Sequence, residues 1–210
     1  MDSKYLPYEV SCKSITSSLD ACDGLMELYN QNQGCCLEGC AGSGKSYVLK
    51  QFRQRLGWNE VAVVSFTGIA SLNIRGSTFH STFKLDLQGR IASGTLKHLK
   101  GVKAILVDEG SMASGALMNI LSIAKKEFNI PIYFFLDWRQ LPPIEKTLSG
   151  EIMKNNVGFI ELCDGNYSKV KYNSKYGRYD DDLYNFTEKF DSLGWFFKEG
   201  INLLGSKMDT

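Results

Sequence analysis

The sequence lacks any apolar run long enough to cross a membrane, although hydrophobic residues make up 43% of its 210 positions. Its first residues, MDSKYLPYEVSCKS, contain no apolar segment of the kind that a secretory signal needs. Internal repeats and low-complexity tracts are also missing. We therefore expect a chain with no membrane partner, whose length suits one sizeable domain with or without an appendage.

Charge of one sign is equally scarce, because the formal net charge is only +1. A nucleic-acid role would then need a local basic face. The six cysteines form no C-x-x-C pair and both histidines are distant from them in sequence, so a zinc site is poorly supported. Cys40 lies in a glycine-rich stretch where a disulfide would obstruct a ligand. We expect an intracellular, reducing compartment, either cytoplasm or nucleus, and a viral origin stays open.

Four short apolar runs are spaced along the first two thirds of the chain. They cover residues 35–38, 61–66, 104–107 and 130–136. Amphipathic helical patterns cover residues 15–29 and 46–56. Short runs of mostly apolar residues suit strands buried on both faces of a parallel sheet, and the segments between them are long enough for crossovers. We predict an α/β fold with helices on both faces. The motifs after the four runs should converge on one crevice, since ligands bind beyond the carboxyl ends of such strands.

The stretch 39–46, GCAGSGKS, fits the phosphate-binding pattern G-x-x-x-x-G-K-[ST] between a predicted strand and a predicted helix. Its first and last glycines allow a tight turn in which consecutive amides point at the β- and γ-phosphates. Lys45 can reach the same phosphates, and the Ser46 hydroxyl can ligate Mg²⁺. The residues predicted to bind the nucleotide are Gly39, Cys40, Ala41, Gly42, Ser43, Gly44, Lys45 and Ser46. The alternative is a glycine-rich turn with a surface lysine.

An acidic pair follows the third apolar run in the stretch ILVDEGS. A phosphate-loop NTPase needs one acid at this place to hold Mg²⁺ and a second group to orient the attacking water. Asp108 suits the first role and Glu109 the second. The alternative is a solvated acidic turn.

Two further stretches are not needed for nucleotide binding alone: FTGIASLNIRGSTFHSTF at 66–83 and LDWRQLPPI at 136–144. Together with GCAGSGKS and VDEGSM, they closely resemble the motifs of superfamily 1 DNA helicases of the Pif and RecD-like group. The four motifs occur in the family's order, and the resemblance covers residues 34–145. It implies the first RecA-like ATPase domain of a motor that uses ATP and Mg²⁺ to unwind DNA in replication, repair or recombination.

The resemblance also implies roles for individual residues. Gln140 would contact the γ-phosphate, and Arg178, in GRYDDDLYNF, would stabilise the transferred charge. The residues that would lie against single-stranded DNA are Thr67, Asn73, Thr78 and His80. As alternatives, His80 would be a structural histidine and Arg178 an exposed side chain paired with the nearby aspartates.

Three aromatic residues could offer stacking faces for bases: Phe79, Phe83 and Trp138. Core packing is the alternative for each of them, and we favour it for Phe83. The sequence departs from the family at two positions: Leu136 replaces a glycine, and Gly110 replaces a larger apolar residue. The segment that reads adenine is not recognisable, so no base preference is predicted.

We divide the chain into a helical lead-in at 1–33, a RecA-like phosphate-loop ATPase core at 34–150, and a tail at 151–210 that contains a predicted helix at 180–190. The tail would lead toward an absent second RecA-like domain, so the chain would be a fragment, a degenerate relative or a split subunit whose partner is a second chain. A single such domain should hydrolyse ATP slowly, because the transition state lacks its full set of cations.

Three other functions stay open. A viral-type RNA helicase domain shares the loop, the acidic pair and the Asp-x-x-Gln pattern, but the 67–81 stretch and the Leu-Pro-Pro ending favour DNA. A nucleotide-binding regulatory or assembly subunit without turnover is opposed by the presence of Lys45, Ser46, Asp108, Glu109 and Gln140. A small-molecule kinase would not need the segment 140–143.

Overall fold

The computed structural model describes residues 12–15, 18–86, 91, 95–138, 140 and 157–170. These residues form a seven-stranded sheet in the order β1-β7-β2-β6-β5-β3-β4, and each pairing between neighbours is parallel. The strands are β1 (Cys12–Ile15), β2 (Cys35–Glu38), β3 (Val61–Ser65), β4 (Ser77–Thr78), β5 (Ala104–Asp108), β6 (Ile132–Leu136) and β7 (Tyr167–Val170).

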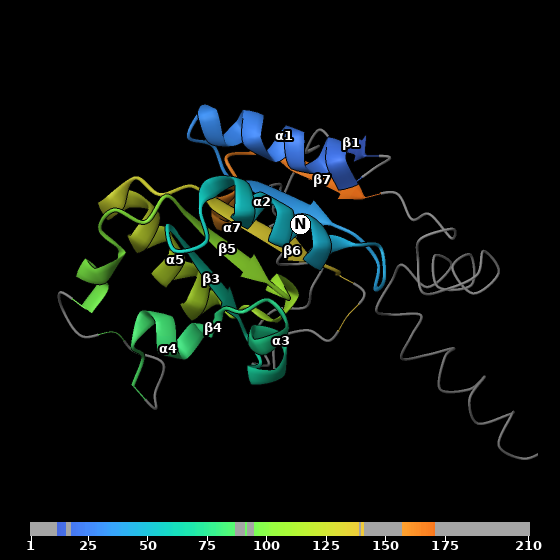
Figure 1. Cartoon of the computed structure of the whole chain (residues 1–210). Coiled ribbons are helices and arrows are strands. Elements are labelled where there is room, and N and C mark those ends of the chain that lie inside the picture. Colours follow the sequence, from blue (N-terminus) through green and yellow to red (C-terminus); the bar gives the residue numbers. More distant parts are fainter. Residues whose placement is uncertain are drawn as a thin grey trace, which may run out of the picture.

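Helices cover both faces of the sheet (Figure 1). On one face lie α1 (Ser18–Asn30) and α2 (Lys45–Leu56), which pack on side chains such as Leu37. The other face is covered by α4 (Phe79–Phe83), the short helix η1 (Thr95–Leu99), α5 (Gly115–Phe128) and α7 (Val157–Leu162). Neighbouring strand residues contribute to opposite faces, since Cys36 belongs to this second cluster. The predicted α/β fold with helices on both faces is confirmed.

The four predicted strands are β2, β3, β5 and β6, and each is buried over nearly its whole length. The remaining strands were not predicted. Two of them, β1 and β7, lie outside the predicted core range 34–150 but pair within the same sheet. The division into lead-in, core and tail otherwise stays a prediction, and the helix predicted at 180–190 lies outside the described residues. None of the described helices is both long and apolar enough to span a bilayer.

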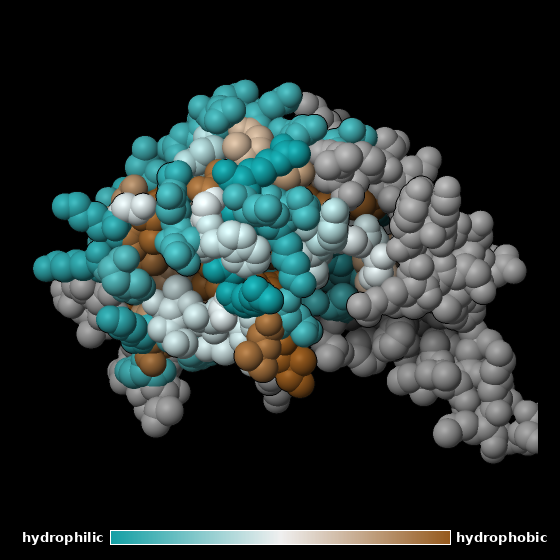
Figure 2. All heavy atoms as spheres, viewed as in Figure 1, coloured by the Kyte–Doolittle hydropathy of each residue, from teal (hydrophilic) through white to brown (hydrophobic). Residues whose placement is uncertain are grey.

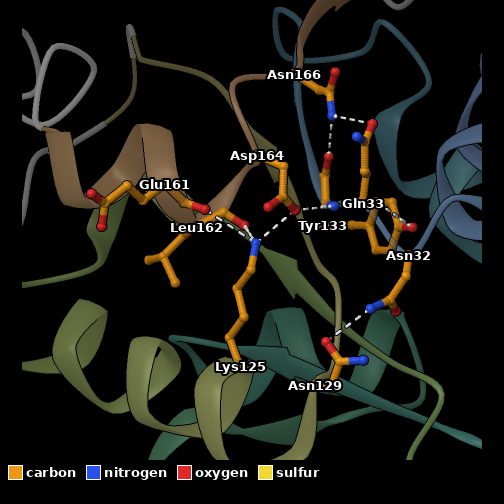
Figure 3. A network of polar contacts seen from close by, with 10 residues as sticks. Asn32, Gln33, Lys125, Asn129, Tyr133, Glu161, Leu162, Asp164 and Asn166 are labelled. Carbon is orange, nitrogen blue, oxygen red and sulfur yellow. Dashed lines mark hydrogen bonds and ion pairs between the residues drawn. The ribbon is translucent and has the colours of Figure 1, made fainter.

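A polar network holds the amino-terminal edge of the sheet (Figure 3). The Lys125 ammonium donates to the Asp164 carboxylate at 2.6 Å and to the carbonyls of Glu161 and Leu162 at 3.1 and 3.0 Å. The cation therefore lies at the carboxyl end of α7, where it complements the helix dipole. The amide of Gly34, just before β2, donates to the same carboxylate at 2.6 Å. One carboxylate thus joins α5, α7 and the entry to β2.

Candidate functional site

The stretch 39–46 forms a loop that joins β2 to α2. Gly42 and Gly44 adopt positive φ angles of 81° and 95°, which glycine tolerates without a Cβ penalty. Lys45 is only 7% exposed, and its ammonium donates to the carbonyls of Gly39 at 2.6 Å and Cys40 at 3.0 Å. The loop is therefore wrapped around the end of its own lysine. When a phosphate binds, Lys45 would exchange these carbonyls for phosphate oxygens.

Three acidic side chains converge on this lysine from the ends of neighbouring strands. Asp108 is the last residue of β5, Glu109 follows it, and Asp137 comes directly after β6. Asp108 and Asp137 are 4% and 3% exposed. The charge of Lys45 interacts with all three carboxylates. The structure thus brings together three of the predicted motifs at the carboxyl edge, because β2, β6 and β5 are adjacent in the sheet.

Burial dominates the electrostatics of this cluster. It raises the pKa of Asp108 to about 6, with a further contribution from the charge of Glu109, while Lys45 acts in the opposite direction. Burial likewise raises the pKa of Glu109 and lowers that of the Lys45 ammonium. Three carboxyl groups therefore share one ammonium. A divalent cation would supply the positive charge that this arrangement needs.

Asp108→Asn is expected to stabilise the nucleotide-free chain near neutral pH by about 1–2 kcal/mol. The pKa of Asp108 is raised in the folded state from 3.8 to about 6. As the pH rises, the Asp108 carboxyl therefore loses its proton in the unfolded chain before it does so in the folded chain. The stability that this proton provides is fully present below about pH 4, and it is lost as the pH rises to about 6. Asparagine does not titrate. Urea unfolding at several pH values should show the advantage of the variant growing across this window, and an advantage independent of pH would contradict the expectation. The exposed Glu127→Gln serves as the control.

Four buried side-chain oxygens have no hydrogen-bond partner among the described residues, namely those of Ser43, Ser65, Glu109 (Oε2) and Ser111. All four lie near the carboxyl edge: one in the phosphate loop, one at the end of β3 beside Asp108, and two just after β5. A buried oxygen without a partner costs about 1–3 kcal/mol, so such groups are expected where a ligand or water completes the bonding. Sequence reasoning gave Ser65 and Ser111 no role, although both follow or end an apolar run.

The side chains fit a nucleotide with Mg²⁺. The Ser46 hydroxyl is exposed at the start of α2, and the Asp108 carboxyl lies in the same cluster as Lys45. Hydroxyl and carboxylate oxygens are ligands that Mg²⁺ accepts. The loop itself leaves little space beyond the backbone, because a Cβ on Gly39 would lie 2.5 Å from the Ser43 hydroxyl oxygen. Glycine at this position keeps the cradle open.

The two departures from the family pattern lie next to each other. A Cβ on Gly110 would be 2.9 Å from Cδ1 of Phe134 and 3.4 Å from Cδ2 of Leu136. The Leu136 side chain is fully buried and occupies the space beside Gly110. A larger residue at 110 would collide here, and a glycine at 136 would leave a cavity. The glycine at 110 therefore lets the acidic turn pack closely on Phe134 and Leu136 of β6.

The residues predicted to contact DNA lie in the segment that runs from the end of β3 to α4. Thr67 caps α3 (Gly68–Asn73) by accepting from the Ala70 amide at 3.1 Å, and Thr78 caps α4 in the same way with Ser81 at 3.3 Å. Each hydroxyl keeps a proton that it can donate. The other two predicted residues, Asn73 and His80, are exposed, as is Thr67, whereas Thr78 is half-buried.

The aromatic residues do not form the expected stacking surface. Phe79 and Phe83 are fully buried with ring centroids 4.3 Å apart, and Trp138 is 8% exposed. The stacking role is therefore wrong for Phe79 and Trp138, and core packing is confirmed for Phe83. The apolar surface here comes instead from α3, where Ile69 and Leu72 are 78% and 77% exposed. Figure 2 shows the hydrophobic side chains gathered over this helix.

Gln140 is half-buried, and its backbone N–H donates to the backbone carbonyl of Asp137 at 3.0 Å. This bond closes a turn that holds the glutamine beside the acidic cluster. The segment 141–143 and Arg178 lie outside the described residues, so their predicted roles are not placed.

A parallel sheet with a phosphate loop after β2 and acids at the end of β5 defines a RecA-like phosphate-loop fold. A sequence model described as PIF1-like helicase matches residues 21–153, and the chain belongs to this family. The ATP-dependent DNA helicase Pif1 of Bdellovibrio bacteriovorus is 31% identical over 140 residues, which are 58% of this chain and 32% of that protein.

Two solved structures share the fold. The Pif1 helicase of Candida albicans superposes with a TM-score of 0.66 at 21% identity, over 85% of this chain and 44% of that one. A Pif1 helicase from Bacteroides, in complex with ADP-AlF3 and ssDNA, gives 0.61 at 20% identity, over 81% and 45%. The chain thus spans about a third of the bacterial relative and less than half of each solved chain.

Proposed function

We propose that this chain is the first ATPase domain of a DNA helicase, in which ATP hydrolysis is coupled to single-stranded DNA binding and duplex unwinding in replication, repair or recombination. The observation that carries the proposal is the convergence of Lys45, Asp108 and Glu109 on the phosphate loop. The family match and the Bacteroides Pif1 complex with ADP-AlF3 and ssDNA support it. Five buried cysteines, Cys22, Cys35, Cys36, Cys40 and Cys163, are not joined in disulfides, which suits a reducing, intracellular compartment.

Within this proposal, the amides of 39–46 bind the β- and γ-phosphates of ATP, and Lys45 neutralises their charge. The Ser46 hydroxyl and Asp108 carboxylate hold Mg²⁺, which supplies positive charge to the phosphates when bound. Glu109 orients the attacking water and accepts its proton, and Gln140 contacts the γ-phosphate. Arg178 and a second RecA-like domain, from the same protein or from another chain, would complete the charge stabilisation.

Single-stranded DNA is the proposed partner of the exposed surface around α3 and β4. Thr67, Asn73, Thr78 and His80 offer hydroxyl, amide and imidazole groups that suit sequence-independent phosphate contacts. The apolar side chains of Ile69 and Leu72 lie between them in the sequence and are open to solvent, where the faces of bases can pack.

ATP hydrolysis by the purified chain tests the proposal, measured alone, with single-stranded DNA, and with RNA of the same sequence. Lys45→Ala is the blank, and Lys126→Ala, an exposed lysine on α5, is the matched control. We expect slow turnover that DNA stimulates, that Lys45→Ala abolishes and that Lys126→Ala leaves unchanged.

Other outcomes favour other functions. Equal stimulation by RNA would favour the RNA helicase alternative. Mg²⁺-dependent ATP binding without turnover would favour a regulatory subunit, and no ATP binding at all would overturn the proposal.

A further inference from the structure

Three buried side chains form a hydrogen-bonded chain beside the phosphate loop. The indole N–H of Trp138 donates to the Tyr167 hydroxyl oxygen at 2.9 Å, and the Tyr167 hydroxyl donates to the Glu38 carboxylate. The exposed fractions of Glu38, Tyr167 and Trp138 are 3%, 7% and 8%. We refer to these residues as the Glu38–Tyr167–Trp138 chain.

The Glu38–Tyr167–Trp138 chain joins the two segments that the proposed function places at the γ-phosphate, which are the phosphate loop and the turn before Gln140. Glu38 ends β2 and directly precedes Gly39, whose carbonyl accepts from the Lys45 ammonium. Trp138 lies inside the turn that the Gln140 amide closes onto the Asp137 carbonyl. Tyr167 is the first residue of β7 and lies beyond the segment 21–153 that the family model matches.

Tyr167 is the connecting member because its hydroxyl is both the donor to Glu38 and the acceptor for Trp138. Burial, and then the charges around it, raise the pKa of Tyr167, so its hydroxyl stays protonated at any working pH. Removing the hydroxyl would take a partner from a buried carboxylate and from a buried N–H at once, which costs more than one ordinary hydrogen bond.

The phosphate loop and the Gln140 turn do not depend equally on the Tyr167 hydroxyl. The phosphate loop has its own supports, since the Gly39 amide donates to the Leu136 carbonyl at 3.1 Å and Lys45 bridges two loop carbonyls. Among the described residues, the indole N–H of Trp138 donates one hydrogen bond, to Tyr167, and the ring packs edge-on against Phe159 with ring centroids 5.3 Å apart. Loss of the Tyr167 hydroxyl should therefore loosen the Gln140 turn more than the loop.

We propose that Tyr167 is a positioning residue that holds the Gln140 turn in register with the phosphate loop, and so sets the preference of the site for nucleoside triphosphate over diphosphate. This inference rests on the proposed function. The loop binds the β-phosphate of both nucleotides, whereas the turn can contact only the γ-phosphate of the triphosphate.

Tyr167→Phe is the test, with affinities for ATPγS and ADP measured by calorimetry in the presence of Mg²⁺. We expect the ratio of triphosphate to diphosphate affinity to fall by about tenfold, while ADP affinity changes by less than about twofold. Trp138→Phe keeps an aromatic ring against Phe159 but removes the N–H donor, and should lower the ratio in the same way. Glu38→Gln keeps an oxygen that accepts from the Tyr167 hydroxyl and should preserve most of the affinity ratio. Tyr29→Phe, the same change on α1, is the matched control.

The outcomes separate this inference from the proposed function. An unchanged ratio in both Tyr167→Phe and Trp138→Phe, or equal weakening for both nucleotides, would overturn the positioning role alone. If Tyr167→Phe fails to fold, Trp138→Phe decides the question. A parent chain that binds neither nucleotide would overturn the proposed function and this inference with it.

Discussion

Replacing Glu109 by glutamine is expected to lower ATP turnover by about 10²–10³-fold while nucleotide affinity stays within a few-fold of the parent chain. Glutamine matches the size of glutamate but cannot accept a proton from water. The Glu109 backbone has a φ of 56°, so the chain takes a left-handed conformation immediately after the last residue of β5. Its Oε2 is buried and has no hydrogen-bond partner within the described part of the chain. A carboxylate held in this way can orient a water molecule.

Phosphate release at saturating DNA measures the effect, relative to the parent chain's own stimulated rate. Binding of a fluorescent ATP analogue is measured in parallel, because the proposed role concerns turnover and not affinity. Glu127→Gln makes the same chemical change on the exposed face of α5 and should leave both quantities unchanged. Parent-like turnover in Glu109→Gln would exclude Glu109 as the base, and loss of binding would indicate a role in holding the nucleotide.

Gly34→Ala is expected to lower the free energy of unfolding by about 2–3 kcal/mol. A Cβ at this position would lie 2.4 Å from the Ile132 carbonyl oxygen and 2.8 Å from that of Leu162. Both neighbours are backbone atoms, one in β6 and one at the end of α7, so neither can rotate away as a side chain can. The backbone amide of Gly34 also donates to the Asp164 carboxylate. Relieving the clash would therefore strain the network with Lys125.

Chemical denaturation measures this effect, and Gly24→Ala is the matched control. Gly24 lies within α1, and a Cβ there would meet nothing within 4 Å. Alanine is the better helix former, so this variant should gain up to about 1 kcal/mol. A Gly34→Ala variant as stable as the parent would show that the backbone around β6 and α7 can shift at little cost.

The central strands could be predicted because each is buried on both faces, and a strand buried on both faces has a mostly apolar sequence. Strands β1 and β7 could not be predicted, since CKSI in β1 and YSKV in β7 alternate with polar residues and resemble loop sequence. The pairing of β7 with β1 and with β2 joins segments more than 100 residues apart, and no local sequence pattern indicates such a contact.

The candidate site shows the same division. Glycine spacing and the position of acids after a strand predicted the phosphate loop and the acidic pair, and the structure brings them together. Glu38, by contrast, is a charged residue at the end of β2, and the sequence indicated no partner for it. Its carboxylate is buried next to a tyrosine 129 positions away, and only the folded chain shows that this polar residue has a partner. The burial of Phe79 and Trp138 was hidden for the same reason.

The position of β2 has a consequence for protein synthesis. In the sheet it lies between β6 and β7, and the ribosome makes both of them long after it. Strands β3, β5 and β6 can pair in the order in which they emerge, but β2 gains its second neighbour only when β7 is complete. Until then its edge can pair with other chains, and such long-range pairing is slow. The strand that leads into the phosphate loop would therefore complete its pairing only after β7 has been made, and nucleotide binding would wait for that step.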